Sequence, residues 1–215
     1  TMKATEYFAN IIFVNASALN SNLILLNSVS SRFPNGLGND NGLLGKYVCH
    51  HNYRAGTGGT FEGHRDKYYK GSKPAECIIP NFRNVHKQDT DFVGGYVIFS
   101  GAYREKLSER GLHSSIGPDF KKAISEPGGW GAYMYLQGET IPKEANHVRL
   151  SRDKTDQWGI PLLITSVGYD DNDDKMVRDF LEQAKAMLEA AGATITYEYD
   201  NHQAPGLDIH EMGGV

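Results

Sequence analysis

The sequence predicts an α+β fold, an antiparallel or mixed sheet with helices, plus a partial α/β piece at its N-terminal end. Three observations support this. Short strand-like runs recur between residues 47 and 167, separated by polar and glycine-rich connections. One long amphipathic helix at 172–191 is followed by an alternating strand. Residues 9–29 instead read as a strand, a tight turn and a helix.

The composition excludes several classes of protein for this chain. The chain has 215 residues, 40% hydrophobic and 22% charged, which is enough for one large or two small domains. Its net charge of −4 offers no basic field for a nucleic acid or an anionic membrane. No apolar run approaches the roughly 20 residues of a membrane helix. The two cysteines exclude a disulfide scaffold and a four-cysteine zinc site.

The N-terminal piece begins with an apolar run at 10–15, which predicts a strand buried on both faces. Ser17 is a suitable N-cap, and leucines at helical spacing extend the helix to Leu26. The turn 16–18 therefore follows the carboxyl end of a strand, where open α/β sheets bind ligands.

After a glycine- and asparagine-rich loop at 30–46, the texture becomes that of an antiparallel sheet. Residues 119–125 predict a short helix. The predicted strands are 47–53, 76–80, 92–100, 130–136, 148–150 and 162–167.

The helix at 172–191 carries apolar side chains at a period of 3.6 residues. The acidic run 170–174 precedes or opens it, where carboxylates cap free amides and complement the helix dipole. This interpretation is preferred over a calcium loop, because Lys175 takes the place of the required glycine. Gly192 is expected to end the helix, and alternation over 194–199 predicts a final strand.

Several candidate sites are weak. His210-Glu211 begins like a zinc-protease motif, but Gly214 stands where the second histidine is needed. Cys49, His50 and His51 are adjacent and cannot all face one metal from a regular strand, so one buried and one exposed histidine is the preferred interpretation. The glycine-rich run 56–61 lacks the dinucleotide-binding spacing and is interpreted as turn chemistry.

His210 is the remaining candidate for chemistry. It lies in a glycine-flanked, irregular segment, GLDIHEMGG at 206–214, and its neutral imidazole could act as a base near neutral pH. On composition alone, a structural histidine in a turn is the alternative.

Four segments, taken in order, resemble the glucose–methanol–choline family of FAD-dependent oxidoreductases, in its bacterial sugar-oxidising branch. IIFVNASALNSNLILLNS (11–28) is similar to a strand-turn-helix of the flavin domain, and NGLGNDNGLLGKYVCHH (35–51) to the linking loop and the G-x-N-x-x-D-H segment. NHVRLSRDKTDQWGIP (146–161) resembles the N-R-V-x-L…D-x-W-G-x-P hairpin. GLDIHEMG (206–213) resembles the H-x-x-G segment with the family's catalytic histidine.

The resemblance implies three parts. Residues 1–46 would be a partial FAD-binding segment with its linking loop, residues 47–200 the substrate-binding domain, and residues 201–215 the start of the return to the FAD domain. The family's glycine-rich unit for the FAD pyrophosphate and its C-terminal second catalytic residue have no counterpart in the sequence. We therefore expect the chain to be an internal fragment that binds no FAD and turns nothing over alone.

The resemblance also implies roles for single residues. His210 would take the hydroxyl proton of a sugar or alcohol while a hydride passes to the flavin. Ser17, Ala18 and Asn20 would lie near the adenosine part of FAD, with an ordinary polar first-turn residue as the alternative for Asn20.

Further along the chain, Gln137 and Glu139 could reach the substrate or orient His210, and the alternative is solvated polar residues at a sheet edge. Tyr133 and Tyr135 share one strand face, where sheet packing is preferred over sugar stacking. The expected partners are a small sugar or alcohol and an electron-acceptor protein, with no metal, nucleic acid or membrane span.

A competing interpretation needs no catalysis. The sheet texture and the 12 tyrosines are also typical of a free-standing carbohydrate- or partner-binding α+β module. A reading frame that continues upstream into a glycine-rich dinucleotide motif would favour the enzyme, whereas start and stop codons at these ends would favour the module.

Overall fold

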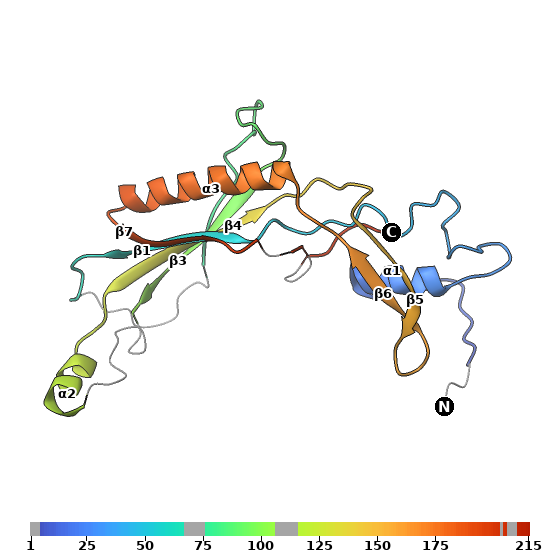
Figure 1. The fold of residues 1–215 in the computed structure, drawn as a ribbon, viewed down its shortest axis with the longest axis horizontal. Coiled ribbons are helices and arrows are strands. Elements are labelled where there is room, and N and C mark those ends of the chain that lie inside the picture. The colour runs from blue at the N-terminus through green and yellow to red at the C-terminus, as the bar shows by residue number, and fades with distance from the viewer. Residues whose placement is uncertain (1–4, 67–75, 106–115, 203, 206–209) are drawn as a thin grey trace. The chain divides into compact units, whose positions relative to one another are not determined.

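The computed structural model describes residues 5–66, 76–105, 116–202, 204–205 and 210–215. The chain forms two compact units (Figure 1). The first unit comprises residues 1–51, 140–169 and 204–215, and the second comprises residues 52–139 and 170–203. Each unit is described by itself below.

The second unit is built on a five-stranded antiparallel sheet with the order β2-β3-β4-β1-β7. The helix α3 (Asp171–Ala190) lies along one face of this sheet (Figure 1). The prediction of an α+β fold with an antiparallel sheet is confirmed. The strands are β1 (Ala55–Phe61), β2 (Cys77–Ile79), β3 (Tyr96–Arg104), β4 (Trp130–Gly138) and β7 (Thr194–Asp200), and a short helix α2 (Gly117–Ser125) lies between β3 and β4.

The core of the second unit lies between α3 and the sheet. Alternate residues of β4 point toward α3 and are buried, as the period of two in a strand requires. Phe180 on α3 is fully buried and meets the ring of Tyr96 edge-on at 6.0 Å. Gly138 is needed where the helix approaches, because a Cβ there would lie 2.3 Å from the sulfur of Met176.

Both ends of α3 follow the predicted chemistry. Asp170 is the N-cap, its carboxylate accepts from the amides of Asn172 and Asp173, and the Asp173 carboxylate accepts from the Asp170 amide. Gly192 follows the helix with a φ of +93°, the left-handed C′ conformation. The capping interpretation of the acidic run is confirmed.

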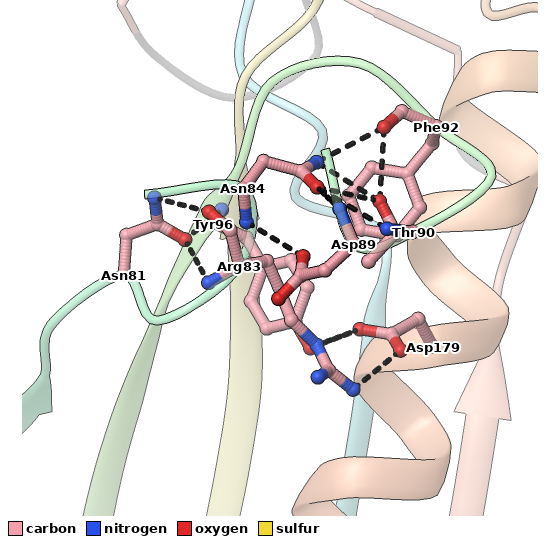
Figure 2. Close-up of polar contacts among 8 residues, drawn as sticks. All are labelled: Asn81, Arg83, Asn84, Asp89, Thr90, Phe92, Tyr96 and Asp179. Atoms are coloured by element: carbon pink, nitrogen blue, oxygen red, sulfur yellow. Dashed lines mark hydrogen bonds and ion pairs between the residues drawn. The ribbon is translucent and has the colours of Figure 1, made fainter. Parts of the chain in front are cut away.

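The loop that precedes β3 is held by side chains rather than by regular structure (Figure 2). The Asn84 side-chain amide donates to Thr90 Oγ1 and to the carbonyls of Phe92 and Gly94. Arg83 then fixes this loop to α3, since its Nε and Nη2 donate to the two carboxylate oxygens of Asp179 at 2.9 and 2.7 Å.

The first unit combines α1 (Ser17–Asn27) with the hairpin β5 (His147–Thr155) and β6 (Pro161–Ser166), and α1 contacts both strands. The predicted strand at 10–15 is wrong. No strand forms there, and Ile11, Ile12 and Phe13 are 71–79% exposed. A strand needs neighbours for its amides and carbonyls, which apolar composition alone does not supply.

Other predictions need smaller corrections. The residue at the N-cap of α1 is Ala16, and Ser17 is the first helical residue, with a φ of +59°. The predicted strand at 47–53 is reduced to isolated bridges at Cys49 and Asn52. None of the described helices is long and apolar enough to cross a membrane.

The run 56–61 is also corrected. It is the fully paired strand β1 between β4 and β7, not a turn. Tyrosines of the neighbouring strand explain its glycines, because a Cβ at Gly56 or Gly58 would lie within 2.4–2.7 Å of the ring atoms of Tyr199 or Tyr197.

Candidate functional site

The segment that carries His210 is paired to residues 45–49 within the first unit. Cys49 and Met212 exchange two backbone hydrogen bonds, each of 3.0 Å, and the Gly45 amide donates to the Gly214 carbonyl at 2.6 Å. The turn after His210 requires glycine, because Gly213 has a φ of +78° and a Cβ there would lie 2.3 Å from the Tyr47 carbonyl oxygen. The backbone pairing thus fixes the position of the His210 backbone relative to residues 45–49.

This pairing explains which residue faces His210. In antiparallel pairing, residues two before Met212 and two after Cys49 lie opposite each other, and these are His210 and His51. Their ring centroids are 4.9 Å apart and the ring planes cross at 85°, an edge-to-face contact. The sequence did not predict this pair.

The His51 side of the pair is anchored by hydrogen bonds to its backbone. The Tyr169 hydroxyl donates to the His51 carbonyl at 3.0 Å, and Thr140 Oγ1 donates to the His50 carbonyl at 2.5 Å. Two residues earlier, the Val48 amide donates to the Asn146 carbonyl at 3.1 Å. The backbone at 48–51 is therefore held by three residues of the first unit that lie outside its helices and strands.

His50 is buried, with 3% of its surface exposed, whereas His51 is half-buried. Neither ring nitrogen of His50 has a hydrogen-bond partner among the described residues. Burial lowers the pKa of His50 below its ordinary value; the nearby Glu211 carboxylate opposes this shift and His51 adds to it. Burial thus favours the neutral form of the His50 imidazole.

Helix α1 reaches the same segment through Asn22. This side chain is fully buried, and its amide donates to the carbonyls of Ala18 at 2.9 Å and Gly213 at 3.4 Å. A Cβ at Gly214 would lie 2.3 Å from the Asn22 amide nitrogen. The contact joins the second turn of α1 to the turn that follows His210.

Ser17, Ala18 and Asn20 occupy the first turn of α1, where Ser17 and Asn20 are exposed and Ala18 is half-buried. The N-cap residue of this helix, Ala16, makes no side-chain hydrogen bond to the first backbone amides of the helix. Small, accessible residues at a helix start fit the close approach of an adenosine or phosphate group. Their role stays a prediction.

A metal centre has no support in the described parts of the chain. Within those residues, no group of three or more histidine, cysteine, aspartate or glutamate side chains could hold a metal ion. Cys49 is buried and Cys77 is exposed, and both are free thiols. Burial raises the pKa of the Cys49 thiol.

The second unit carries a different feature, an aromatic sheet face opposite α3, here called the tyrosine face. Its rings come from β3, β4 and β7, and glycines of the neighbouring strands lie beneath four of them. The ring planes of Tyr133 and Tyr135 are within 7° of parallel, and those of Phe99 and Tyr135 within 2°. The tyrosine face comprises Phe99, Tyr103, Tyr133, Tyr135, Tyr197 and Tyr199.

Glu76 organises the centre of the tyrosine face. Its carboxylate oxygen Oε1 accepts from the Tyr135 hydroxyl at 2.5 Å and lies 3.5 Å from the Tyr133 hydroxyl. Burial and the hydrogen bond to Glu76 raise the pKa of Tyr135. At the end of the face a hollow of about 310 Å³ is lined by Thr60, Tyr103, Glu105, Gly129, Trp130 and Gly131.

The two predicted substrate residues lie in different surroundings at the end of β4. Gln137 shares the strand face of Tyr133 and Tyr135 and is half-buried. Glu139 follows β4 and is exposed, and one of its carboxylate oxygens accepts from the Gly95 amide at 3.0 Å. Their roles toward a substrate stay predictions.

The sequence assigned no role in these sites to three residues: His51, Asn22 and Glu76. The contact of His51 with His210 could have been predicted only from the pairing of Cys49 with Met212, and no local sequence pattern indicates that pairing. Asn22 lies among leucines on α1, and its burial and its hydrogen bond to the Gly213 carbonyl are visible only in the fold. Glu76 lies just before a short strand and gives no signal of its own.

Comparison with known proteins places the chain near two dehydrogenases. It is 30% identical over 198 residues to a 2-methyl-1,2-propanediol dehydrogenase of Mycolicibacterium austroafricanum, which covers 89% of the chain. It is 25% identical over 159 residues, 71% of the chain, to the fructose dehydrogenase large subunit of Gluconobacter japonicus. No protein-family model matches the chain.

The chain spans 35% and 28% of the lengths of these two relatives. Both relatives are named as dehydrogenases.

Proposed function

We propose that the chain is part of an FAD-dependent oxidoreductase that oxidises a hydroxyl group of a sugar or alcohol, with His210 as the base. The single observation that carries the proposal is the pinned position of His210. Its segment is paired to residues 45–49 and its ring meets His51 at 4.9 Å. The similarity to a diol dehydrogenase and to a fructose dehydrogenase subunit supports the same class of reaction.

The reaction needs a proton acceptor and a hydride acceptor. An imidazole nitrogen of His210 takes the proton of the substrate hydroxyl, while the hydrogen bound to the carbon that bears this hydroxyl leaves with its electron pair as a hydride. FAD, when bound, supplies the acceptor for that hydride. The exposed position of His210 is consistent with contact to a small substrate.

The first turn of α1 is proposed to lie against the adenosine part of FAD. Ser17 and Ala18 have small side chains that allow close approach, and Asn20 offers an amide for hydrogen bonding. Gln137 and Glu139 are proposed to meet the substrate. An electron-acceptor protein is the proposed partner of the reduced enzyme.

The test uses the intact protein with bound FAD and substrate. We expect His210→Ala to slow reduction of the flavin by about 10²–10⁴-fold, with the FAD content unchanged. His147→Ala is the matched control, because this histidine lies in the same unit and its Nδ1 lies 2.8 Å from the carbonyl oxygen of the nearby Ala145. Undiminished flavin reduction in His210→Ala would remove His210 from the reaction.

A second experiment addresses the chain by itself. We expect the 215-residue chain to be colourless after purification and to reduce no dye with glucose or a glycoside. A yellow preparation that reduces the dye would contradict the expectation that the FAD-binding part lies elsewhere.

The tyrosine face supports a second candidate function, carbohydrate binding by the second unit. Tyr197 and Tyr199 are 40% and 44% exposed, and their rings lie over glycines and so turn flat surfaces outward. Such surfaces pack well against the C–H faces of sugar rings. Titration of the chain with glucose or cellobiose, followed by NMR, should shift the Tyr197 and Tyr199 ring signals. No shift at millimolar sugar would reject this candidate.

A further inference from the structure

The His210 ring contacts the His51 ring within the first unit, and the backbone pairing explains why. Pairing of Cys49 with Met212 sets the two histidines opposite each other, and their rings meet edge to face at 4.9 Å and 85°. The contact does not depend on the relative placement of the two units, because both residues belong to the first unit.

We propose that His51 is a positioning residue that fixes the imidazole of His210 in its reactive orientation. The inference rests on the proposed function of His210. His51 itself is assigned no contact with the substrate, the flavin or the reacting atoms, and it acts only through His210.

The two partners differ in how firmly they are held. His210 is exposed and has a φ of +71°, a conformation that residues other than glycine rarely adopt. His51 is half-buried, and the Tyr169 hydroxyl holds its carbonyl at 3.0 Å. The His51 ring, carried on this held backbone, packs against the exposed His210 ring and limits its rotamers, and a base must be oriented to accept a proton efficiently.

The neighbouring groups do not replace His51 in this role. His50 precedes it but is buried with 3% exposure. Met212 is engaged through its backbone, since its amide and carbonyl pair with Cys49 at 3.0 Å. The aromatic edge contact for His210 thus comes from His51 among the described residues.

The first experiment tests the contact in the 215-residue chain, without FAD or substrate. Imidazole signals of His210 are recorded by NMR in the wild type, His51→Ala, His51→Phe and the control His147→Ala. We expect the nuclear Overhauser effect between the rings of residues 51 and 210 in the wild type and in His51→Phe. We expect the His210 signals to move in His51→Ala and to stay unchanged in His147→Ala.

Folding of the variants is checked separately by alkylation of Cys49, which is buried beside the paired segment. If Cys49 stays protected and the His210 signals are the same in the wild type and in His51→Ala, the proposal is overturned. If Cys49 becomes reactive in His51→Ala, this variant has lost its native fold, and the proposal is then tested by the ring-to-ring nuclear Overhauser effect in His51→Phe and in the wild type. Loss of the ring contact in His51→Phe with Cys49 protected also overturns the proposal.

The second experiment uses the intact enzyme with FAD bound. We expect His51→Ala to lower the maximal rate of flavin reduction about 2- to 12-fold, as loss of one aromatic edge contact would. The KM and the FAD content should not change, and His51→Phe should recover most of the rate because it restores a ring at this position.

The outcomes separate the two proposals. If His210→Ala abolishes flavin reduction but both His51 variants react at the wild-type rate, the positioning role is wrong and the proposed function stands. If His210→Ala reacts normally, the proposed function fails, while the NMR experiment still reports whether His51 orients His210.

Discussion

The ion pair between Arg83 and Asp179 gives the sharpest test of how the second unit is held together. Asp179 on α3 accepts from Arg83 at 2.7 and 2.9 Å and from the Tyr96 hydroxyl at 2.5 Å (Figure 2). The side chains of Arg83 and Asp179 are only 21% and 19% exposed. Removal of the carboxylate would leave a largely desolvated guanidinium and a buried phenol hydroxyl without their acceptor.

The magnitude follows from these three bonds. Hydrogen bonds to charged groups contribute about 1.5–3 kcal/mol each, but bonds that share one carboxylate are not additive. Breaking a buried pair costs about 3–5 kcal/mol, and the one-fifth exposure places this pair at the lower end. We therefore expect Asp179→Ala to lower the free energy of opening by about 3 kcal/mol, and Tyr96→Phe to lower it by about 1 kcal/mol.

The assay is amide hydrogen exchange of β3 and β4, read by NMR, which reports the opening free energy of the second unit alone. Asp171→Ala is the matched control, because this aspartate is on the same helix and pairs with Lys175 at 2.7 Å, but its side chain is 76% exposed. An exposed i,i+4 pair contributes only about 0.3–0.5 kcal/mol.

A double-mutant cycle isolates the pair. Arg83→Met combined with Asp179→Ala should cost little more than Asp179→Ala alone, since the guanidinium has then lost its acceptor. If the opening free energy of the Asp179→Ala variant equals that of the Asp171→Ala variant, the loop before β3 is not held to α3 by this pair and our reasoning is refuted.

Three further predictions concern single groups. Because burial lowers the pKa of His50, its imidazole binds fewer protons in the folded state than in the unfolded state. The free energy of unfolding of the first unit should therefore be highest above about pH 6.5 and should fall as the pH drops toward the folded-state pKa. His50→Leu should remove this pH dependence, as measured by urea unfolding at several pH values. Cys77 should be alkylated rapidly and Cys49 slowly, whereas equal rates would contradict the burial of Cys49. Gly58→Ala should destabilise the sheet by about 1–3 kcal/mol, measured by hydrogen exchange of β1 and β7, because its Cβ would overlap the Tyr197 ring.

The sequence predicted best those elements whose signals are local. The helix expected at 172–191 is α3 at 171–190, with the capping aspartate and the terminal glycine where expected. The strand expected at 194–199 is β7 at 194–200. Periodicity and capping act within a few residues, so no tertiary information was needed.

Predictions failed where the structure depends on neighbours far along the chain. The strand expected at 10–15 is apolar, but apolar residues form a strand only when another strand accepts their backbone hydrogen bonds. Conversely, the glycines at 56, 58 and 59 suggested a turn, whereas β1 is paired on both sides. We interpreted these glycines as a sign of a turn, whereas Gly56 and Gly58 make room for tyrosine rings of β7 and Gly59 makes room for the Thr194 carbonyl.

The candidate site shows the same limit in a different form. His210 could be selected from its own segment, but the residue that faces it, His51, lies 159 positions earlier and is specified only by the pairing of Cys49 with Met212. That pairing in turn requires Gly213 to pass close to the Tyr47 carbonyl. A motif in the sequence thus identifies the histidine, and the register of two distant segments decides which ring it meets. For this reason variants at 51 and 213 test the site more directly than further substitutions beside His210.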